Sequence, residues 1–244
     1  MNPESPVTIA DLEQQHNLQS RTLSTPTALV VMPSRPLVIC LHGSGSSAAI
    51  FHAQARRIRS TLASQFEFLF IDAPFESPPG PGILPFFEDA GPYFRWFTNE
   101  ERSREAEWSA ILSTLEAALE RCGRAPSDVR GVMGFSQGAL VASLLLHQAK
   151  FHGDPRWSAL SYSILLCGGG AESAVSKLLN VPSVHLHGLK DPYLINGRLL
   201  LKWYNPANAT VITHDGGHHM PTATDDVKRL ADAIVQVNRQ TEEW

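Results

Sequence analysis

The chain has 244 residues and a mass of 26.8 kDa, and its 20 Lys and Arg residues against 24 Asp and Glu residues give a formal net charge of −4. A pI near 6.2 and the lack of a basic run argue against a nucleic-acid-binding protein, because such proteins need cationic surface to neutralise phosphates. Hydrophobic residues make up 43% of the chain and charged residues 18%, which is typical of a folded globular protein.

The cysteines and the N-terminal segment bear on the compartment and on cofactors. Cys40, Cys122 and Cys167 are too widely spaced for a C-x-x-C zinc site, and three cysteines give no disulfide framework. The first 26 residues contain acidic side chains and no apolar core, unlike a signal peptide. The longest apolar runs have the length of a strand, not of a membrane span. We therefore expect a soluble cytoplasmic protein without metal or other cofactor and without membrane contact; no oligomeric state is predicted.

Apolar runs alternate with helical patterns along most of the chain. We interpret the polar, proline-containing residues 1–35 as an N-terminal extension and residues 36–244 as a single domain. Strands are predicted, in chain order, at 36–41, 66–71, 129–135, 161–166, 183–187 and 210–213. Helices are predicted at 48–62, 99–121, 139–148, 194–203 and 224–239. This alternation predicts an α/β fold, a mainly parallel sheet with helices on both faces, in which the loops at the C-terminal strand ends carry function.

A candidate nucleophile follows the strand predicted at 129–135. That strand ends in Gly-Phe-Ser-Gln-Gly, with Ser136 at the centre. In a G-x-S-x-G motif the serine occupies a tight turn between a strand and a helix. Its hydroxyl is then exposed above the sheet, and the helix N-terminus favours developing negative charge. Because the motif lies between a predicted strand and a predicted helix, Ser136 is the candidate nucleophile.

A serine hydroxyl needs a base and a group that orients this base. In this type of sheet the order along the chain is serine, acid, histidine. Asp191 lies just after one predicted strand, and His218 and His219 lie in a glycine-rich loop after the next. All belong to the sheet edge that carries Ser136. His218 directly follows two glycines and is favoured as the base, with His219 as the alternative.

Acyl transfer also needs N–H donors for the oxyanion that forms at the carbonyl. One should be the backbone amide of Gln137, the residue after the candidate nucleophile. The second should come from the loop 42–47, which follows the first predicted strand and is rich in Gly and Ser. The amide of Ser44 is the natural candidate. A phosphate-binding loop is the alternative, but no phosphate-binding glycine motif is present.

Residues 74–98 contain several prolines, which argue against a regular element, so we predict a long loop. The second half of this loop is rich in aromatic residues. The candidate pocket residues are Phe87, Tyr93, Phe94, Trp96 and Phe97, together with His42. These side chains could line an apolar acyl pocket, or the rings could form a satellite core beneath the loop.

Five motifs occur here in the order found in a known family: LHGSGS, FIDAP, GFSQGA, HGLKDP and GGHHMP. The chain resembles the fungal family of serine hydrolases related to the human ovarian-cancer-associated serine hydrolase. The resemblance implies an α/β-hydrolase fold, and it places the family's catalytic residues on Ser136, Asp191 and His218. Many members are thioesterases or esterases of polyketide gene clusters that free an acyl chain from a carrier-protein thioester. This chain departs from the usual pattern at Ser44, where a bulkier apolar residue is common, and in its long N-terminal segment.

The leading hypothesis is a serine hydrolase that cleaves a thioester or ester of a hydrophobic acyl group through an acyl-enzyme. Its expected substrate is a polyketide presented by an acyl carrier protein. A general carboxylesterase is the alternative, as is an acyltransferase or cyclase that uses an alcohol instead of water. A non-catalytic α/β-hydrolase scaffold is disfavoured because Ser, Asp and His co-occur. A metal-dependent hydrolase built from the histidines at 185, 187, 218 and 219 is disfavoured. His185 and His187 alternate on one face of a predicted strand and could form a metal pair, but no third ligand keeps a recognisable spacing to them.

Overall fold

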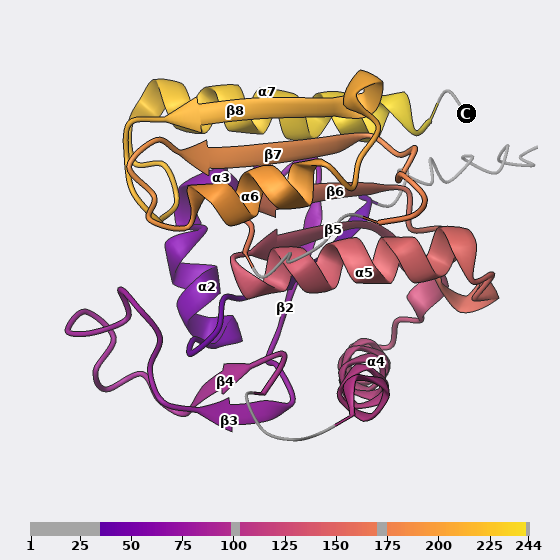
Figure 1. The fold of residues 1–244 in the computed structure, drawn as a ribbon, viewed down its shortest axis with the longest axis horizontal. Helices are drawn as coiled ribbons and strands as arrows, with labels where there is room; N and C mark the ends of the chain where they lie inside the picture. The colour runs from indigo at the N-terminus through magenta and orange to yellow at the C-terminus, as the bar shows by residue number, and fades with distance from the viewer. Residues whose placement is uncertain (1–34, 99–102, 170–174, 243–244) are drawn as a thin grey trace, which may run out of the picture. The chain divides into compact units, whose positions relative to one another are not determined.

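A computed structural model describes residues 35–98, 103–169 and 175–242, so nearly all of the extension predicted at 1–35 lies outside the described residues. Within them, six strands form one sheet in the order β2-β1-β5-β6-β7-β8, and every neighbouring pair is parallel (Figure 1). The strands are β1 Leu37–Leu41, β2 Glu67–Ile71, β5 Val129–Phe135, β6 Tyr162–Leu166, β7 Ser183–Gly188 and β8 Ala209–His214. Each lies where the apolar pattern predicts it, and no bound differs from the prediction by more than one residue.

The middle of the sheet is buried on both faces, which explains why its strands are continuous apolar runs. Every residue of β1, and every residue of β6, is buried. Successive side chains of a strand point to opposite faces. Accordingly, Leu37, Ile39 and Leu41 join one hydrophobic cluster, and Val38 and Cys40 join the other. The core therefore consists of two layers, one on each side of the sheet.

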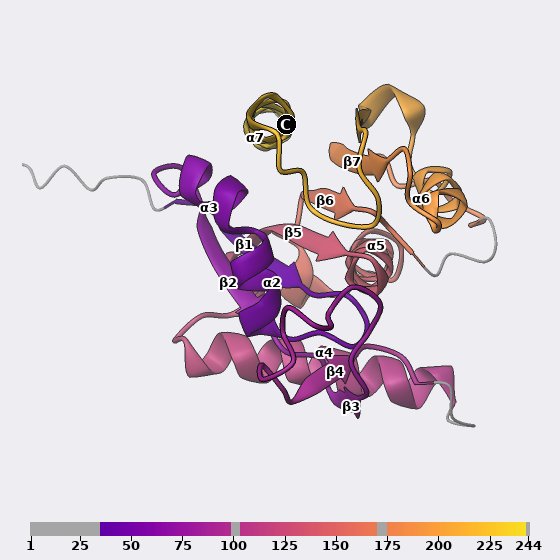
Figure 2. The same ribbon diagram turned by 90° about the vertical axis from the view of Figure 1, so that its left-hand side faces the viewer.

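Helices cover both layers (Figure 2). One layer is packed by α2 Ala48–Gln54, α3 Arg56–Leu62 and α7 Thr224–Gln240, and the other by α4 Arg104–Arg121, α5 Gln137–Phe151 and α6 Leu194–Leu201. Short 3-10 turns lie at Pro126–Asp128, Pro155–Trp157 and Pro206–Asn208. Within the described part of the chain, no helix has both the length and the apolar character needed to cross a membrane.

Two helix predictions are corrected by the structure. The helix predicted at 48–62 is interrupted at Ala55, which ends α2 and precedes α3. The helix predicted at 99–121 begins at residue 104, where the hydroxyl of Ser103 accepts a hydrogen bond from the amide of Ala106 at 3.1 Å. This capping bond explains the later start, because a helix N-terminus leaves amides that need an acceptor. Residues 99–102 lie outside the described residues.

The prediction of a loop without regular structure at 74–98 is wrong. Strands β3 Phe75–Ser77 and β4 Tyr93–Arg95 pair as a two-stranded antiparallel sheet. The prolines lie directly outside these short strands and so remove no amide from the pairing. The strand β4 also contacts the loop after β1, because Ser46 and Phe94 form an antiparallel bridge. The aromatic segment is thereby attached to the edge of the main fold that carries the candidate site.

Candidate active site

Ser136 lies in a strained turn between the C-terminal end of β5 and the N-terminus of α5. Its φ is 52° and its ψ is −117°, a conformation that a residue with a side chain rarely adopts. The neighbouring glycines permit the turn because a Cβ on Gly134 would lie 2.3 Å from the carbonyl oxygen of Gly138. A Cβ on Gly138 would lie 2.2 Å from the carbonyl oxygen of Leu41. The motif therefore has the backbone geometry that its sequence predicts.

His218 and Asp191 come from the loops after β8 and β7, and their side chains meet. Nδ1 of His218 lies 2.8 Å from Oδ2 of Asp191. The other carboxylate oxygen of Asp191 accepts a hydrogen bond from the amide of Tyr193 at 2.7 Å. Because an ionised carboxylate only accepts hydrogen bonds, the proton of a neutral His218 ring lies on Nδ1. Nε2 is then the nitrogen that can accept a proton.

Two rings hold the imidazole of His218 beside Ser136. Its centroid lies 5.0 Å from that of Phe135, the residue before Ser136, and 4.9 Å from that of Tyr193. Within the described residues, no hydrogen bond joins the Ser136 hydroxyl to His218. Such bonds are often long without substrate and tighten in the complex. His219 is differently engaged, because its Nε2 accepts from the amide of Gly217 at 3.1 Å and its Nδ1 lies 2.8 Å from a backbone carbonyl oxygen.

The turn after β6 contacts all of these groups, and the sequence analysis missed it. Cys167 has a φ of 46° and is buried. Its Sγ, an oxygen of Asp191 and a ring nitrogen of His218 all lie within 4.8 Å of one another. Burial and the nearby carboxylate of Asp191 raise the pKa of Cys167 to about 12, so the thiol is protonated, and it donates to the carbonyl oxygen of His219 at 3.7 Å. The amide of Gly169 donates to the carbonyl oxygen of Ser136 at 3.0 Å.

The same three side chains are the described group that could hold a metal ion. Thiolate, carboxylate and imidazole are all zinc ligands. Here, however, the carboxylate and the imidazole are hydrogen-bonded to each other and the thiol is protonated. His185 and His187 do not belong to this group. His185 instead accepts from or donates to Ser183 at 3.1 Å, and burial lowers its pKa to about 3. The four histidines of the metal hypothesis therefore do not form one cluster: His218 belongs to the group with Cys167 and Asp191, and His185 and His187 do not.

The two amides predicted as oxyanion donors flank Ser136. A Cβ on Gly43 would lie 3.3 Å from Cβ of Ser136, which places the loop 42–47 directly against the serine. In that loop the amides of Gly45 and Ser46 donate hydrogen bonds to the carbonyl oxygen of Phe94, at 2.8 and 3.2 Å. The amides of Ser44 and Gln137 have no acceptor within the described part of the chain. These two N–H groups are therefore free to bind an oxyanion.

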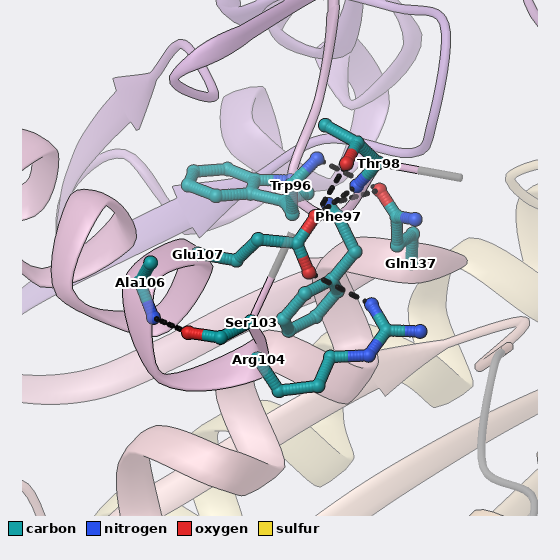
Figure 3. A network of polar contacts seen from close by, with 8 residues as sticks. All are labelled: Trp96, Phe97, Thr98, Ser103, Arg104, Ala106, Glu107 and Gln137. Carbon is teal, nitrogen blue, oxygen red and sulfur yellow. Dashed lines mark hydrogen bonds and ion pairs between the residues drawn. The ribbon is translucent and has the colours of Figure 1, made fainter. Parts of the chain in front are cut away.

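A polar network extends from Gln137 along the aromatic segment to α4 (Figure 3). Oε1 of Gln137 accepts from the amide of Trp96 at 2.8 Å and from that of Phe97 at 3.4 Å. The amide and the hydroxyl of Thr98 each lie 2.6 Å from Oε1 of the buried Glu107. Burial alone raises the pKa of Glu107, but hydrogen bonds from Thr98 and Arg104 outweigh this and leave the pKa below its ordinary value. The carboxylate is thus ionised and fixes the end of the segment.

The structure corrects two of the predicted pocket residues. Trp96 and His42 have no exposed surface and pack inside the protein, so neither lines a pocket in this conformation. The ring of His42 bonds to the backbone on both sides: Nε2 accepts from the amide of Ala73 at 3.0 Å, and Nδ1 lies 2.7 Å from the carbonyl oxygen of Gly43. Burial lowers the pKa of His42, in keeping with a neutral ring. A buried polar group needs such partners, which the sequence pattern alone does not reveal.

The other predicted pocket residues are partly buried. Phe94 and Phe97 pack against the core layer of α4 and α5, as the alternative of a satellite core predicts. The hydroxyl of Tyr93 donates to the carbonyl oxygen of Phe87 at 2.5 Å, which closes the tip of the segment. Tyr193, which contacts His218, is 42% exposed and was missed because its segment carries no aromatic cluster.

The comparison with protein families shows to which family the chain belongs. The model of the family described as Serine hydrolase (FSH1) matches residues 32–230. The chain belongs to this family. The similarity to curated relatives agrees with this family membership. The probable esterase tazC of Aspergillus terreus is 33% identical, and the match covers 84% of this chain and 93% of that protein. The esterase FUS5 of Gibberella fujikuroi is 36% identical, with coverage of 86% and 91%.

A further relative of this FSH1 serine hydrolase is a thioesterase. It is the Aspergillus terreus enzyme named for dihydromonacolin L and the lovastatin nonaketide synthase, and it is 31% identical over 82% of this chain and 90% of that protein. Among solved structures, a carboxylesterase from Mesorhizobium loti is similar with a TM-score of 0.57 at 22% identity, covering 83% of this chain and 89% of that one. The α/β-hydrolase fold is thereby confirmed. The protein is a serine hydrolase with esterase and thioesterase relatives.

Proposed function

We propose that Ser136, His218 and Asp191 act as a catalytic triad. The observation that carries this proposal is the Asp191–His218 hydrogen bond of 2.8 Å beside the strained turn of Ser136. In the reaction, Oγ of Ser136 attacks the acyl carbonyl carbon while Nε2 of His218 takes the hydroxyl proton. Asp191 keeps the ring oriented and stabilises the imidazolium. The imidazolium then gives its proton to the leaving thiol or alcohol, and an acyl-enzyme remains.

The acyl-enzyme is released by the same groups acting on water. His218 takes a proton from a water molecule, whose oxygen attacks the acyl carbonyl carbon, and returns that proton to Oγ of Ser136. In both steps the carbonyl oxygen becomes an oxyanion. The amides of Ser44 and Gln137 are its donors in this proposal, and each such donor is worth about 10²–10³ in rate. Neither amide has a hydrogen-bond acceptor within the described part of the chain, which supports this assignment.

The proposed substrate is a thioester or ester of a hydrophobic acyl group, in particular a polyketide carried by an acyl carrier protein. Two observations support this choice. An aromatic ring is exposed beside the site, because Tyr193 is 42% exposed and its ring lies 4.9 Å from that of His218. A relative that matches over most of both chains is named as the thioesterase of a polyketide synthase product. An apolar acyl chain gains free energy by covering such surface.

The proposal is tested by intact-mass labelling with a fluorophosphonate, followed by turnover of acyl thioesters and of matched oxygen esters of increasing chain length. We expect one adduct on the wild type and none on Ser136→Ala. We expect kcat/KM to rise with chain length and to be higher when the acyl group is loaded on a carrier protein than when it is a free thioester. A folded wild type without an adduct would overturn the triad, and a preference for short oxygen esters would indicate a general carboxylesterase.

A further inference from the structure

Trp96 is hydrogen-bonded to both segments that carry the proposed oxyanion donors. Its backbone amide donates to Oε1 of Gln137 at 2.8 Å, and Gln137 is the first residue of α5. Its indole Nε1 donates to the carbonyl oxygen of His42 at 2.8 Å, two residues before Ser44. One residue with no exposed surface therefore joins the segment of one donor to the segment of the other.

The neighbours of Trp96 each reach one side only. Phe94 bonds to the loop 42–47, through its carbonyl oxygen to Gly45 and through its amide to Ser46 at 2.7 Å. The amide of Phe97 reaches Gln137 alone, at 3.4 Å. These contacts align the segment with the loop and with the helix separately. They do not fix the loop relative to the helix as Trp96 does.

The far end of the segment is anchored as well. Glu107 accepts two hydrogen bonds from Thr98 and lies 2.8 Å from a guanidinium nitrogen of Arg104. The guanidinium carbon of Arg104 lies 5.6 Å from the ring centroid of Phe97. In Figure 3 the side chains of Gln137 and Glu107 both approach the backbone of this segment. The segment is therefore held between α4 and α5 and cannot shift without breaking buried hydrogen bonds.

We propose that Trp96 is a positioning residue that sets the separation of the two oxyanion amides, with the side chain of Gln137 as its partner on α5. This inference rests on the proposed function, because it takes the amides of Ser44 and Gln137 as the donors. Oxyanion stabilisation depends on donors that are in place before the reaction. A displacement of about 1 Å can cost about 10²-fold in rate. Trp96 thus acts through these amides, without touching the substrate.

The test removes each hydrogen bond of Trp96 in a separate variant. The effect of each substitution is compared with that of a matched substitution outside the site. Trp96→Phe removes the indole donor and keeps an aromatic ring, and Gln137→Met removes the acceptor on the helix. The indole of Trp108 on α4 also donates a hydrogen bond, here directly to the side chain of Gln148 on α5, outside the site. Trp108→Phe and Gln148→Met are therefore the matched controls. The measurements are kcat and KM per active site, with the sites counted by fluorophosphonate titration, and the melting temperature.

We expect Trp96→Phe and Gln137→Met each to lower kcat per titrated site by about 10–100-fold with KM changed less than about threefold. The melting temperatures of the control variants should fall by a similar amount, but their kcat should equal that of the wild type. Wild-type kcat in both site variants would overturn the inference. Should Trp96→Phe not fold, Gln137→Met decides alone. A wild type that takes no label at Ser136 would refute the proposed function instead, so the two failures are distinguishable.

Discussion

The carboxylate of Asp191 lies 2.8 Å from Nδ1 of His218, and the exposed fractions of the two side chains are only 2% and 14%. Charges in such surroundings interact more strongly than at the surface, because little water screens them. The pair is therefore suited to stabilise a positive charge that forms on the imidazole during proton transfer. Its geometry also selects the tautomer of the neutral ring.

Asp191→Asn should lower kcat/KM by about 10⁴-fold while the protein stays folded, because the amide cannot select the tautomer with the proton on Nδ1. Asp215→Asn is the matched control, since Asp215 is exposed on the loop that carries His218. The measurement is ester hydrolysis at saturating and at low substrate, together with the rate of fluorophosphonate labelling. Equal losses in the two variants would contradict the role of Asp191.

Cys167→Ala should lower kcat/KM by about 2–10-fold, because the thiol donates to the carbonyl oxygen of His219 at 3.7 Å, on the loop of His218, and lies beside the carboxylate of Asp191. Cys167→Ser keeps a donor at this position and should retain most of the activity. Cys122→Ala, at an exposed free cysteine, should have no effect. The measurement is kcat/KM of the three variants. If kcat/KM of Cys167→Ser is no higher than that of Cys167→Ala, the thiol only fills space and its hydrogen bond does not contribute.

The strain at Ser136 can be measured without any substrate. Both Ser136→Gly and Ser136→Ala remove the nucleophile, but only glycine adopts a φ of 52° without steric cost. The glycine variant should therefore be more stable than the alanine variant by about 1 kcal/mol, after its greater loss of chain entropy is subtracted. Urea unfolding of the two inactive variants provides this comparison. Equal midpoints would mean that the turn is not strained.

His185 should make the stability of the fold depend on pH. Burial lowers its pKa from 6.5 to about 3, so the unfolded chain binds a proton that the folded chain does not. The stabilising contribution is thus complete above pH 6.5 and falls as the pH drops toward 3, by up to about 1.4 kcal/mol per pH unit. His185→Gln should flatten the curve over this range relative to wild type. His52→Gln, at an exposed position, should leave it unchanged.

The strand ends could be predicted because each depends on a short local pattern. An apolar run followed by glycine or a polar turn places Ser136, Asp191 and His218 at one edge of a parallel sheet. The positions of Trp96 and Cys167 depend instead on which distant segments pack against them. Trp96 looks like any other member of an aromatic cluster, and its burial follows only from bonds to residues far along the chain.

The interruption at Ala55 and the pairing of β3 with β4 were likewise beyond the reach of the pattern. The apolar spacing of residues 48–62 continues through the break, so periodicity alone predicts one helix. The prolines around β3 and β4 suggest a loop, because three-residue strands are too short to show alternation. Tertiary contacts decide both cases.

The order of the strands has a consequence for how activity arises in a newly made chain. Ser136 follows β5 in the interior of the sheet, whereas Asp191 and His218 follow β7 and β8, the last two strands to be synthesised. A nascent chain that ends after β6 already carries Ser136 but has neither Asp191 nor His218. With the proposed triad of Ser136, His218 and Asp191, we expect activity to appear only when β8 has joined the sheet edge. During translation or refolding, the onset of activity therefore marks the completion of the sheet and not its nucleation.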